Sequence, residues 1–132
     1  MPADTPRFLT LAEALEIHQD QIARYGGIPG IRDLDLLKSA LAMPAASFGG
    51  QYLHSGLREM AAAYLFHLVS NHPFVDGNKR VGAVAALIFM ELNGLAASPP
   101  QKELYEAVMA VARGELDKAD LAVRMKRWAG RG

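Results

Sequence analysis

The stretch Ser70–Gly94, SNHPFVDGNKRVGAVAALIFMELNG, decides the fold of this chain. It begins as a polar turn and becomes a nearly unbroken apolar run over residues 81–90, which predicts a helix buried on most of its sides. The segment before it, residues 57–71, is apolar on almost every side after Glu59, and predicts a second buried helix. Because both flanking helices are expected to be buried, the turn between them is held at both ends. We therefore expect this turn to be a rigid site.

Working outward, the sequence predicts four more helices, separated by Gly and Pro. A capping box, Thr10 with Glu13, opens the first of them, and Gly26–Gly27 ends it. Ser98 is expected to cap a later helix, with Gln101 closing a second capping box. The four helices are expected within residues 10–27, 33–43, 98–114 and 117–128.

Strand signals are confined to Phe48–Leu53, where turn-forming residues surround two aromatic side chains. This predicts an extended or hairpin segment. The fold class is therefore all-α, with six helices and at most a small hairpin, and a chain of 132 residues is expected to form one domain, residues 1–132.

Composition limits the classes of function. Lys and Arg total 14, as do Asp and Glu, so the domain has no net attraction to a polyanion, and we expect no direct nucleic-acid partner. There is no cysteine, which fits a reducing compartment and excludes thiolate chemistry. No apolar run approaches the ~18 residues of a membrane span, and no signal peptide is evident. We expect a soluble, cytoplasmic protein without a membrane partner.

The turn combines features of a phosphate site. If the following helix starts near Gly77 or Asn78, its first unpaired N–H groups point into the turn and can bind an anion. Lys79 and Arg80 follow in the first helical turn, where cations oppose the helix dipole unless an anion lies between them. A phosphate chain would compensate, because Arg offers a bidentate fork and Lys a point charge.

Other residues of the turn suggest catalysis. A lone carboxylate beside phosphates, here Asp76, commonly holds Mg²⁺. His72 has the chemistry to take a proton from an attacking hydroxyl. Asn78 can bind a phosphate or cap the helix, and Phe74 is assigned to packing. A structural alternative stays open at this point: a helix–helix corner in which Asp76 or Asn78 caps the helix and the two cations are solvated.

The string HPFVDGNKR, residues 72–80, resembles the signature of the Fic/Doc superfamily, and of its Doc (death-on-curing) toxin branch in particular. That branch has the pattern His-x-Phe-x-Asp/Asn-Gly/Ala-Asn-Lys-Arg, and each defined position is present here. The likeness extends to IARYGGIPGIRDLDLLKSAL, FGGQYLHSGL and ARGEL, and so spans nearly the whole chain. It implies a compact six-helix bundle with a small flap hairpin or loop.

The resemblance also implies roles. His72 matches the general base, Asp76 the Mg²⁺-associated carboxylate, and Gly77–Arg80 the phosphate-binding loop and helix start. The residues matched to phosphate binding are thus Gly77, Asn78, Lys79 and Arg80. The flap, against which a target protein is aligned, is expected at SFGGQY. Its predicted residues are Phe48, Gly49, Gly50, Gln51 and Tyr52.

Two departures from the AMP-transferring Fic pattern bear on the reaction. Lys79 replaces a Gly of that pattern, and Ala83 stands where its second Arg would be. In Doc-type members this implies transfer of the γ-phosphoryl group of ATP, which makes the chain a protein kinase of unusual fold. AMP transfer by the same His72 is the nearest rival, and a non-catalytic interaction module is the rival from another class. The implied target is a Ser or Thr of a translation factor such as elongation factor Tu.

The resemblance finally implies a partner. The self-inhibitory Fic motif fails here because Met60 follows Glu59, so inhibition is expected from a small antitoxin that folds on binding. Trp128 is equally consistent with an antitoxin surface and with core packing. His67 is expected in the core, whereas His18 and His54 are expected at the surface.

Overall fold

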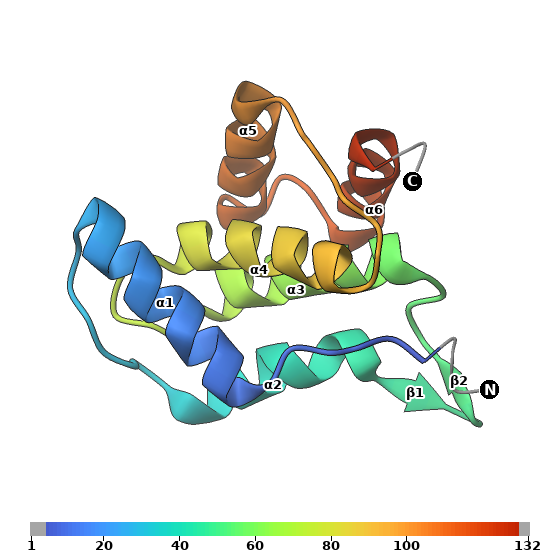
Figure 1. Ribbon diagram of the computed structural model, residues 1–132, viewed down its shortest axis with the longest axis horizontal. Coiled ribbons are helices and arrows are strands. Elements are labelled where there is room, and N and C mark those ends of the chain that lie inside the picture. The colour runs from blue at the N-terminus through green and yellow to red at the C-terminus, as the bar shows by residue number, and fades with distance from the viewer. Residues whose placement is uncertain (1–4, 130–132) are drawn as a thin grey trace.

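The computed structural model describes residues 5–129. Within these residues the chain forms six α-helices, one short 3₁₀ helix and a two-stranded hairpin (Figure 1). The predicted all-α class is thereby confirmed. None of the helices in this part of the chain is long and apolar enough to cross a membrane. The elements are α1 (Leu11–Tyr25), α2 (Leu34–Ala42), η2 (Met43–Ala45), β1 (Ser47–Phe48), β2 (Gln51–Tyr52), α3 (Leu57–Asn71), α4 (Asn78–Leu92), α5 (Gln101–Ala112) and α6 (Lys118–Trp128).

Helix α3 is the centre of the bundle. It packs against α2, α4, α5 and α6, and its residues Tyr64, Leu65 and Leu68 are completely buried. Burial on several sides explains why its sequence is apolar almost all round. Helix α4 packs closely on α3 because Gly82 has no side chain: a Cβ there would lie 2.8 Å from Val69 Cγ2. This close pair fixes the positions of both ends of the turn at residues 72–77.

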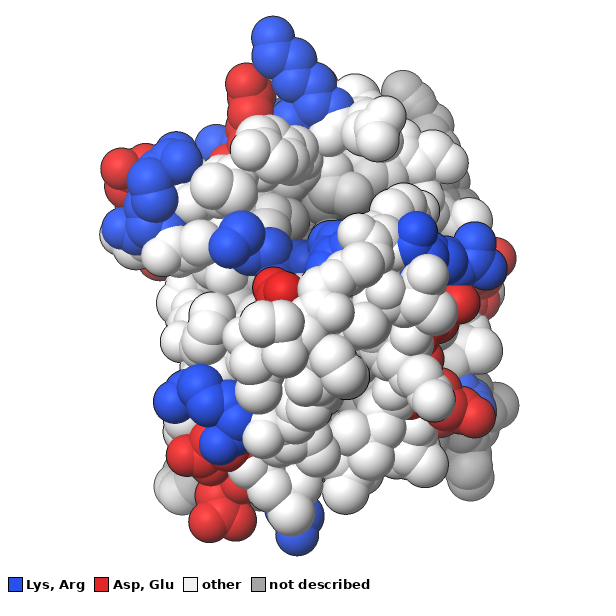
Figure 2. Space-filling model, turned by 90° about the vertical axis from the view of Figure 1, so that its left-hand side faces the viewer, with Lys and Arg blue, Asp and Glu red and all other residues white. Residues whose placement is uncertain are grey.

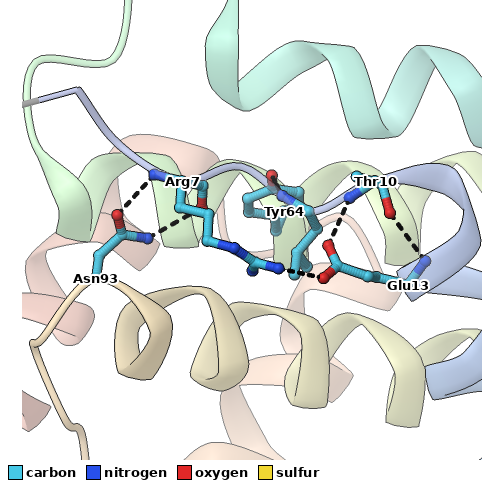
Figure 3. Close-up of polar contacts among 6 residues, drawn as sticks. Arg7, Thr10, Glu13, Tyr64 and Asn93 are labelled. Atoms are coloured by element: carbon cyan, nitrogen blue, oxygen red, sulfur yellow. Dashed lines mark hydrogen bonds and ion pairs between the residues drawn. The ribbon is translucent and has the colours of Figure 1, made fainter. Parts of the chain in front are cut away.

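The segment before α1 is tied to the core by polar contacts (Figure 3). The predicted capping box is confirmed, since Glu13 N–H donates to Thr10 Oγ1 and Thr10 N–H donates to the Glu13 carboxylate. Arg7 N–H donates to Asn93 Oδ1 at 2.7 Å, and Leu9 N–H donates to the Tyr64 hydroxyl at 2.8 Å. Burial raises the pKa of Tyr64 to about 12, so this hydroxyl stays neutral. The contacts hold α1 across α4.

The start of α5 differs from the prediction. The helix begins at Gln101, its N-cap is Pro100, and no side chain caps it. The capping box of Ser98 with Gln101 is therefore wrong. The reason is Pro100: a proline disfavours helical backbone at the residue before it, so the helix starts two residues later than expected. Caps by Asp33 on α2 and by Asp117 on α6 are present.

The hairpin is short and regular. Ser47 pairs with Tyr52 and Phe48 with Gln51 in antiparallel register. The two connecting residues, Gly49–Gly50, both have positive φ, as the favoured two-residue hairpin turn requires. The hairpin leads into the N-terminal end of α3 (Figure 1).

Candidate active site

The turn predicted to form the active site connects α3 to α4. The side chain of Asn78 closes this turn with two hydrogen bonds. Asn78 Oδ1 accepts from the N–H of Phe74, and Asn78 Nδ2 donates to the carbonyl of Phe74, both at 2.9 Å. Phe74 is fully buried and Asn78 is 4% exposed. Because the Asn78 amide is engaged in this way, the group of Asn78 that can meet a phosphate is its backbone N–H.

His72 ends α3 and has left-handed backbone angles, φ 52° and ψ 53°. A non-glycine residue in this region is strained by about 1 kcal/mol or more. Arg32 holds the strained residue: its Nε donates to the His72 carbonyl at 2.6 Å and its Nη2 to the Asn71 carbonyl at 2.9 Å. The backbone is thereby fixed while the His72 side chain remains exposed.

His18 supports the turn from α1. Its ring stacks on the ring of Phe74 with centroids 3.9 Å apart and an interplanar angle of 5°. Its Nε2 lies 2.9 Å from the carbonyl oxygen of Asp76. His18 is 6% exposed, so the expectation that it lies at the surface is wrong. The sequence alone does not predict this burial, because it does not show that α1 packs across the turn.

Residues 26–33, here called the 26–33 loop, run along the turn and pair with it. Arg32 N–H donates to the Pro73 carbonyl at 2.7 Å, and Val75 N–H donates to the Gly30 carbonyl at 3.0 Å. Ile31 and Phe74 form an antiparallel bridge between these hydrogen bonds. The 26–33 loop therefore lies directly beside His72.

Asp76 is set in place by backbone donors. Its carboxylate accepts from the N–H of Ile28 at 3.0 Å and from its neighbour Gly77 at 2.8 Å. These two hydrogen bonds hold the pKa of Asp76 below its ordinary value, and the nearby Arg80 and Lys79 charges lower it further. Each carboxylate oxygen accepts one bond, so lone pairs remain for a cation.

Lys79 and Arg80 complete the site at the start of α4. Arg80 Nη2 donates to the Gly26 carbonyl at 2.9 Å, and its guanidinium lies 5.8 Å from the ring centre of Tyr25. Lys79 is exposed. Figure 2 shows a band of basic side chains across this face, with a small acidic surface beside it. A cavity of about 150 Å³ is lined by His72, Asp76, Gly77, Asn78, Lys79 and Arg80.

The structure does not bring the predicted flap to this cavity. The hairpin at residues 47–52 precedes the N-terminal end of α3, whereas His72 follows its C-terminal end (Figure 1). A helix of 15 residues, roughly 22 Å long, separates them. Tyr52 instead contacts Phe8 at the far end of the bundle. Phe48, Gly49, Gly50, Gln51 and Tyr52 therefore lie away from His72, and the segment beside His72 is the 26–33 loop.

Histidines away from the turn form a second polar group. His67 Nε2 accepts from Lys118 Nζ at 2.9 Å. Burial lowers the pKa of His67 to about 4, with further lowering by the Lys118 charge and by His54. His54 is partly buried, in contrast to its expected surface position. Trp128 is 8% exposed and donates to Glu103 at 3.1 Å, so its packing alternative is the correct one.

The chain belongs to the Fic/DOC family, whose profile matches residues 8–90, more than half of its length. Two relatives place it in the Doc toxin branch. It is 30% identical over 126 residues to "Protein kinase doc" of Escherichia phage P1, which covers 94% of this chain and 97% of the relative. It is 36% identical over 107 residues to "Toxin Doc" of Mycolicibacterium smegmatis, covering 80% of this chain and 82% of the relative.

Sequence reasoning missed the residues that hold the site from outside the signature. They are His18, Gly27, Ile28 and Arg32. Only the glycines gave a signal: Gly26, Gly27 and Gly30 are more than one helix C-cap requires. The third of these glycines, Gly30, indicates a loop with a defined backbone conformation. In the structure this loop pairs with the turn through the Gly30 carbonyl.

Proposed function

We propose that this chain is the toxin of a toxin–antitoxin pair and an ATP- and Mg²⁺-dependent phosphotransferase that modifies a Ser or Thr hydroxyl of a protein. One observation carries the proposal: a base, a carboxylate, the first N–H groups of a buried helix and two cations line one cavity. A turn that only connected two helices would not require these groups to line one cavity. The similarity to a relative named a protein kinase supports the same reaction.

The phosphates of ATP would bind at the start of α4. The N–H groups of Asn78, Lys79 and Arg80 have no carbonyl four residues earlier within the helix, and so are available to phosphate oxygens. Gly77, the N-cap with φ 81°, lets a phosphate approach the backbone. The Lys79 and Arg80 charges stabilise the negative charge of the transferring group.

His72 would act as the general base. It takes the proton of the target hydroxyl while that oxygen forms a bond to the γ-phosphorus, and the bond from this phosphorus to the β–γ bridging oxygen breaks, which releases ADP. Such proton transfer contributes roughly 10²–10⁴-fold in rate. The Arg32 contacts to the His72 and Asn71 carbonyls keep this residue in place for the transfer.

The residues present fit Mg²⁺ bound together with a nucleotide. No group of three or more His, Cys, Asp or Glu able to hold a metal occurs within residues 5–129, so a cage made of protein alone is absent from that part of the chain. Mg²⁺ is typically held by one or two carboxylates plus phosphate oxygens and water, and Asp76 supplies an ionised carboxylate with free lone pairs. When bound, Mg²⁺ neutralises charge on the phosphates.

Both protein partners belong to the proposal. The target would lie along the 26–33 loop, whose Ile28 and Ile31 side chains are exposed next to the turn. A Ser or Thr of a translation factor such as elongation factor Tu is the proposed acceptor. A small antitoxin that folds on binding is the proposed inhibitor, in line with the similarity to a relative named a toxin.

The test is to incubate wild-type and His72→Ala protein with Mg²⁺, ATP labelled at the α or the γ phosphate, and either a cell lysate or purified elongation factor Tu. A protein labelled only from γ, and only by wild type, supports the proposal. Label from the α position would assign AMP transfer instead. An absence of His72-dependent label from either position would favour the non-catalytic module.

A further inference from the structure

Arg32 contacts three consecutive carbonyl oxygens around the residue proposed as the base. Its side chain donates from Nε to the His72 carbonyl at 2.6 Å and from Nη2 to the Asn71 carbonyl at 2.9 Å. Its backbone N–H donates to the Pro73 carbonyl at 2.7 Å. One residue of the 26–33 loop therefore holds the chain before, at and after His72.

These contacts replace the ordinary end of a helix. The other five α-helices within residues 5–129 each end with the N–H of the C-cap residue donating to a carbonyl of the same helix, whereas the C-cap of α3, His72, makes no such bond. The last carbonyls of α3 need donors from elsewhere, and a cation at this end also complements the helix dipole. Arg32 supplies both the donors and the charge.

The guanidinium of Arg32 is not engaged by a carboxylate. The ion pairs within residues 5–129 join other side chains, and the neighbouring carboxylate of Asp33 accepts from the Leu36 N–H at 3.0 Å to cap α2. The planar guanidinium presents its N–H groups in a fixed fork, which here spans two adjacent carbonyls. The single ammonium of a lysine would not reproduce that fork.

The backbone conformation of His72 decides where its imidazole lies. Its φ of 52° is in the left-handed region, which is unfavourable for a residue with a side chain. A return to ordinary helical φ would rotate the backbone by roughly 115° and move the imidazole away from the cavity that it lines with Asp76 and Lys79. The same rotation would break the contacts with Arg32, so these contacts oppose it.

We propose that Arg32 is the positioning residue of the general base. It acts through the backbone of His72, which it holds in the left-handed conformation, and it joins the base to the loop along which the target would lie. The inference rests on the proposed function, because it takes His72 as the base. It follows that the base is correctly placed only while the 26–33 loop is paired with the turn.

Steady-state kinetics of the full chain test the inference with γ-labelled ATP, Mg²⁺ and purified elongation factor Tu. Arg32→Ala should lower kcat by about tenfold to 100-fold, because misplacement of a base is costly, and should change the KM of ATP by less than about twofold. Arg32→Lys keeps the charge but loses the fork, so we expect a similar fall in kcat. Full kcat in Arg32→Lys would overturn the inference, because charge alone would then be sufficient.

Asn71→Ala is the matched control. It removes the hydrogen bond from Asn71 Nδ2 to the Leu36 carbonyl at 3.0 Å, which also joins α3 to α2, but it leaves the three carbonyls bound by Arg32 in place. Its kcat should change by less than about twofold. A loss equal to that of Arg32→Ala would overturn the inference, because it would assign the effect to a loosened contact between α2 and α3.

The ¹³Cα and ¹³Cβ chemical shifts of His72 report its backbone conformation without turnover. We expect left-handed values in wild type and in Asn71→Ala, and a shift toward right-handed values in Arg32→Ala and Arg32→Lys. Left-handed values in both Arg32 variants would overturn the inference. If the shifts change as expected but wild type transfers no phosphate, the proposed function fails, whereas the assignment of Arg32 to the His72 conformation stands.

Discussion

The Nε2 atom of His18 lies 2.9 Å from the backbone carbonyl oxygen of Asp76, while the His18 ring is stacked on Phe74. One side chain of α1 thus contacts both the apolar anchor of the turn and the residue assigned to the cation. The first helix therefore positions a site whose signature lies 54 or more residues later in the chain, counting from His18 to His72. Loss of this support should affect both stability and catalysis.

Replacing His18 separates its two contributions. His18→Ala removes the stacked ring and the hydrogen bond, and should lower the free energy of unfolding by about 2–4 kcal/mol. His18→Phe keeps a ring on Phe74 but leaves the Asp76 carbonyl unpaired, for an expected loss of about 1–2 kcal/mol. Urea unfolding measures both. Equal losses for the two variants would contradict the expectation, because they would mean that the stacked ring contributes nothing beyond the hydrogen bond.

Gly27 is required because it lies between Asp76 and Arg80. A Cβ at Gly27 would be 2.8 Å from Asp76 Oδ2 and 3.2 Å from Arg80 Nη2, and its φ of +124° is itself unfavourable for a side chain. Gly27→Ala should reduce phosphate transfer at least about 100-fold by displacing both groups. Label transfer from γ-labelled ATP measures the effect.

Gly30→Ala is the matched control for this change. Gly30 has nearly the same φ, +120°, but a Cβ there meets only Val75 Cγ2 at an ordinary 3.6 Å. Both variants carry the same backbone penalty, so the difference in activity between them reports the displacement of Asp76 and Arg80. Similar activities in the two variants would contradict the assignment of Gly27.

Two substitutions of His72 should separate the strain of its backbone from the activity of its side chain. Its left-handed backbone suits glycine, so His72→Gly is expected to be more stable than His72→Ala by about 1 kcal/mol, whereas neither variant transfers phosphate. Thermal unfolding compares the two proteins under one condition. A His72→Ala variant as stable as His72→Gly would show that this backbone conformation is not strained.

The sequence predicted what depends on local signals. The capping box at Thr10, the buried pair of helices and the turn between them follow from patterns within a few residues. The sequence did not predict the parts of the site that come from distant segments of the chain. His18 and Arg32 reach the turn across 54 and 40 residues, from His18 to His72 and from Arg32 to His72, and no spacing rule connects them. The signals at Phe48–Leu53 predict an extended or hairpin segment, and the structure forms a hairpin at residues 47–52; its place relative to His72 depends on the length of α3.

A pH-dependent contribution to stability is expected at the contact of α3 with α6. His67 has a pKa of about 4 in the folded chain, lowered by burial, by Lys118 and by His54, against an ordinary value of about 6.5 when unfolded. Between these two values the unfolded chain binds more protons, so the free energy of unfolding falls as the pH falls from about 6.5 toward 4. We expect the melting temperature to drop by about 3–6 °C between pH 7 and pH 5.

The variant His67→Leu isolates this effect, because it removes the titrating group and keeps the packing on α6. Its melting temperature should change less between pH 7 and pH 5 than that of wild type, and Lys118→Met should have a smaller effect in the same direction by removing one of the charges that lower the pKa. Asp76 does not interfere, since the N–H donors of Ile28 and Gly77 keep its pKa below the ordinary range for a carboxylate. If wild type and His67→Leu lost stability in parallel over this pH range, the histidine would have to be solvated and the contact with Lys118 open in solution.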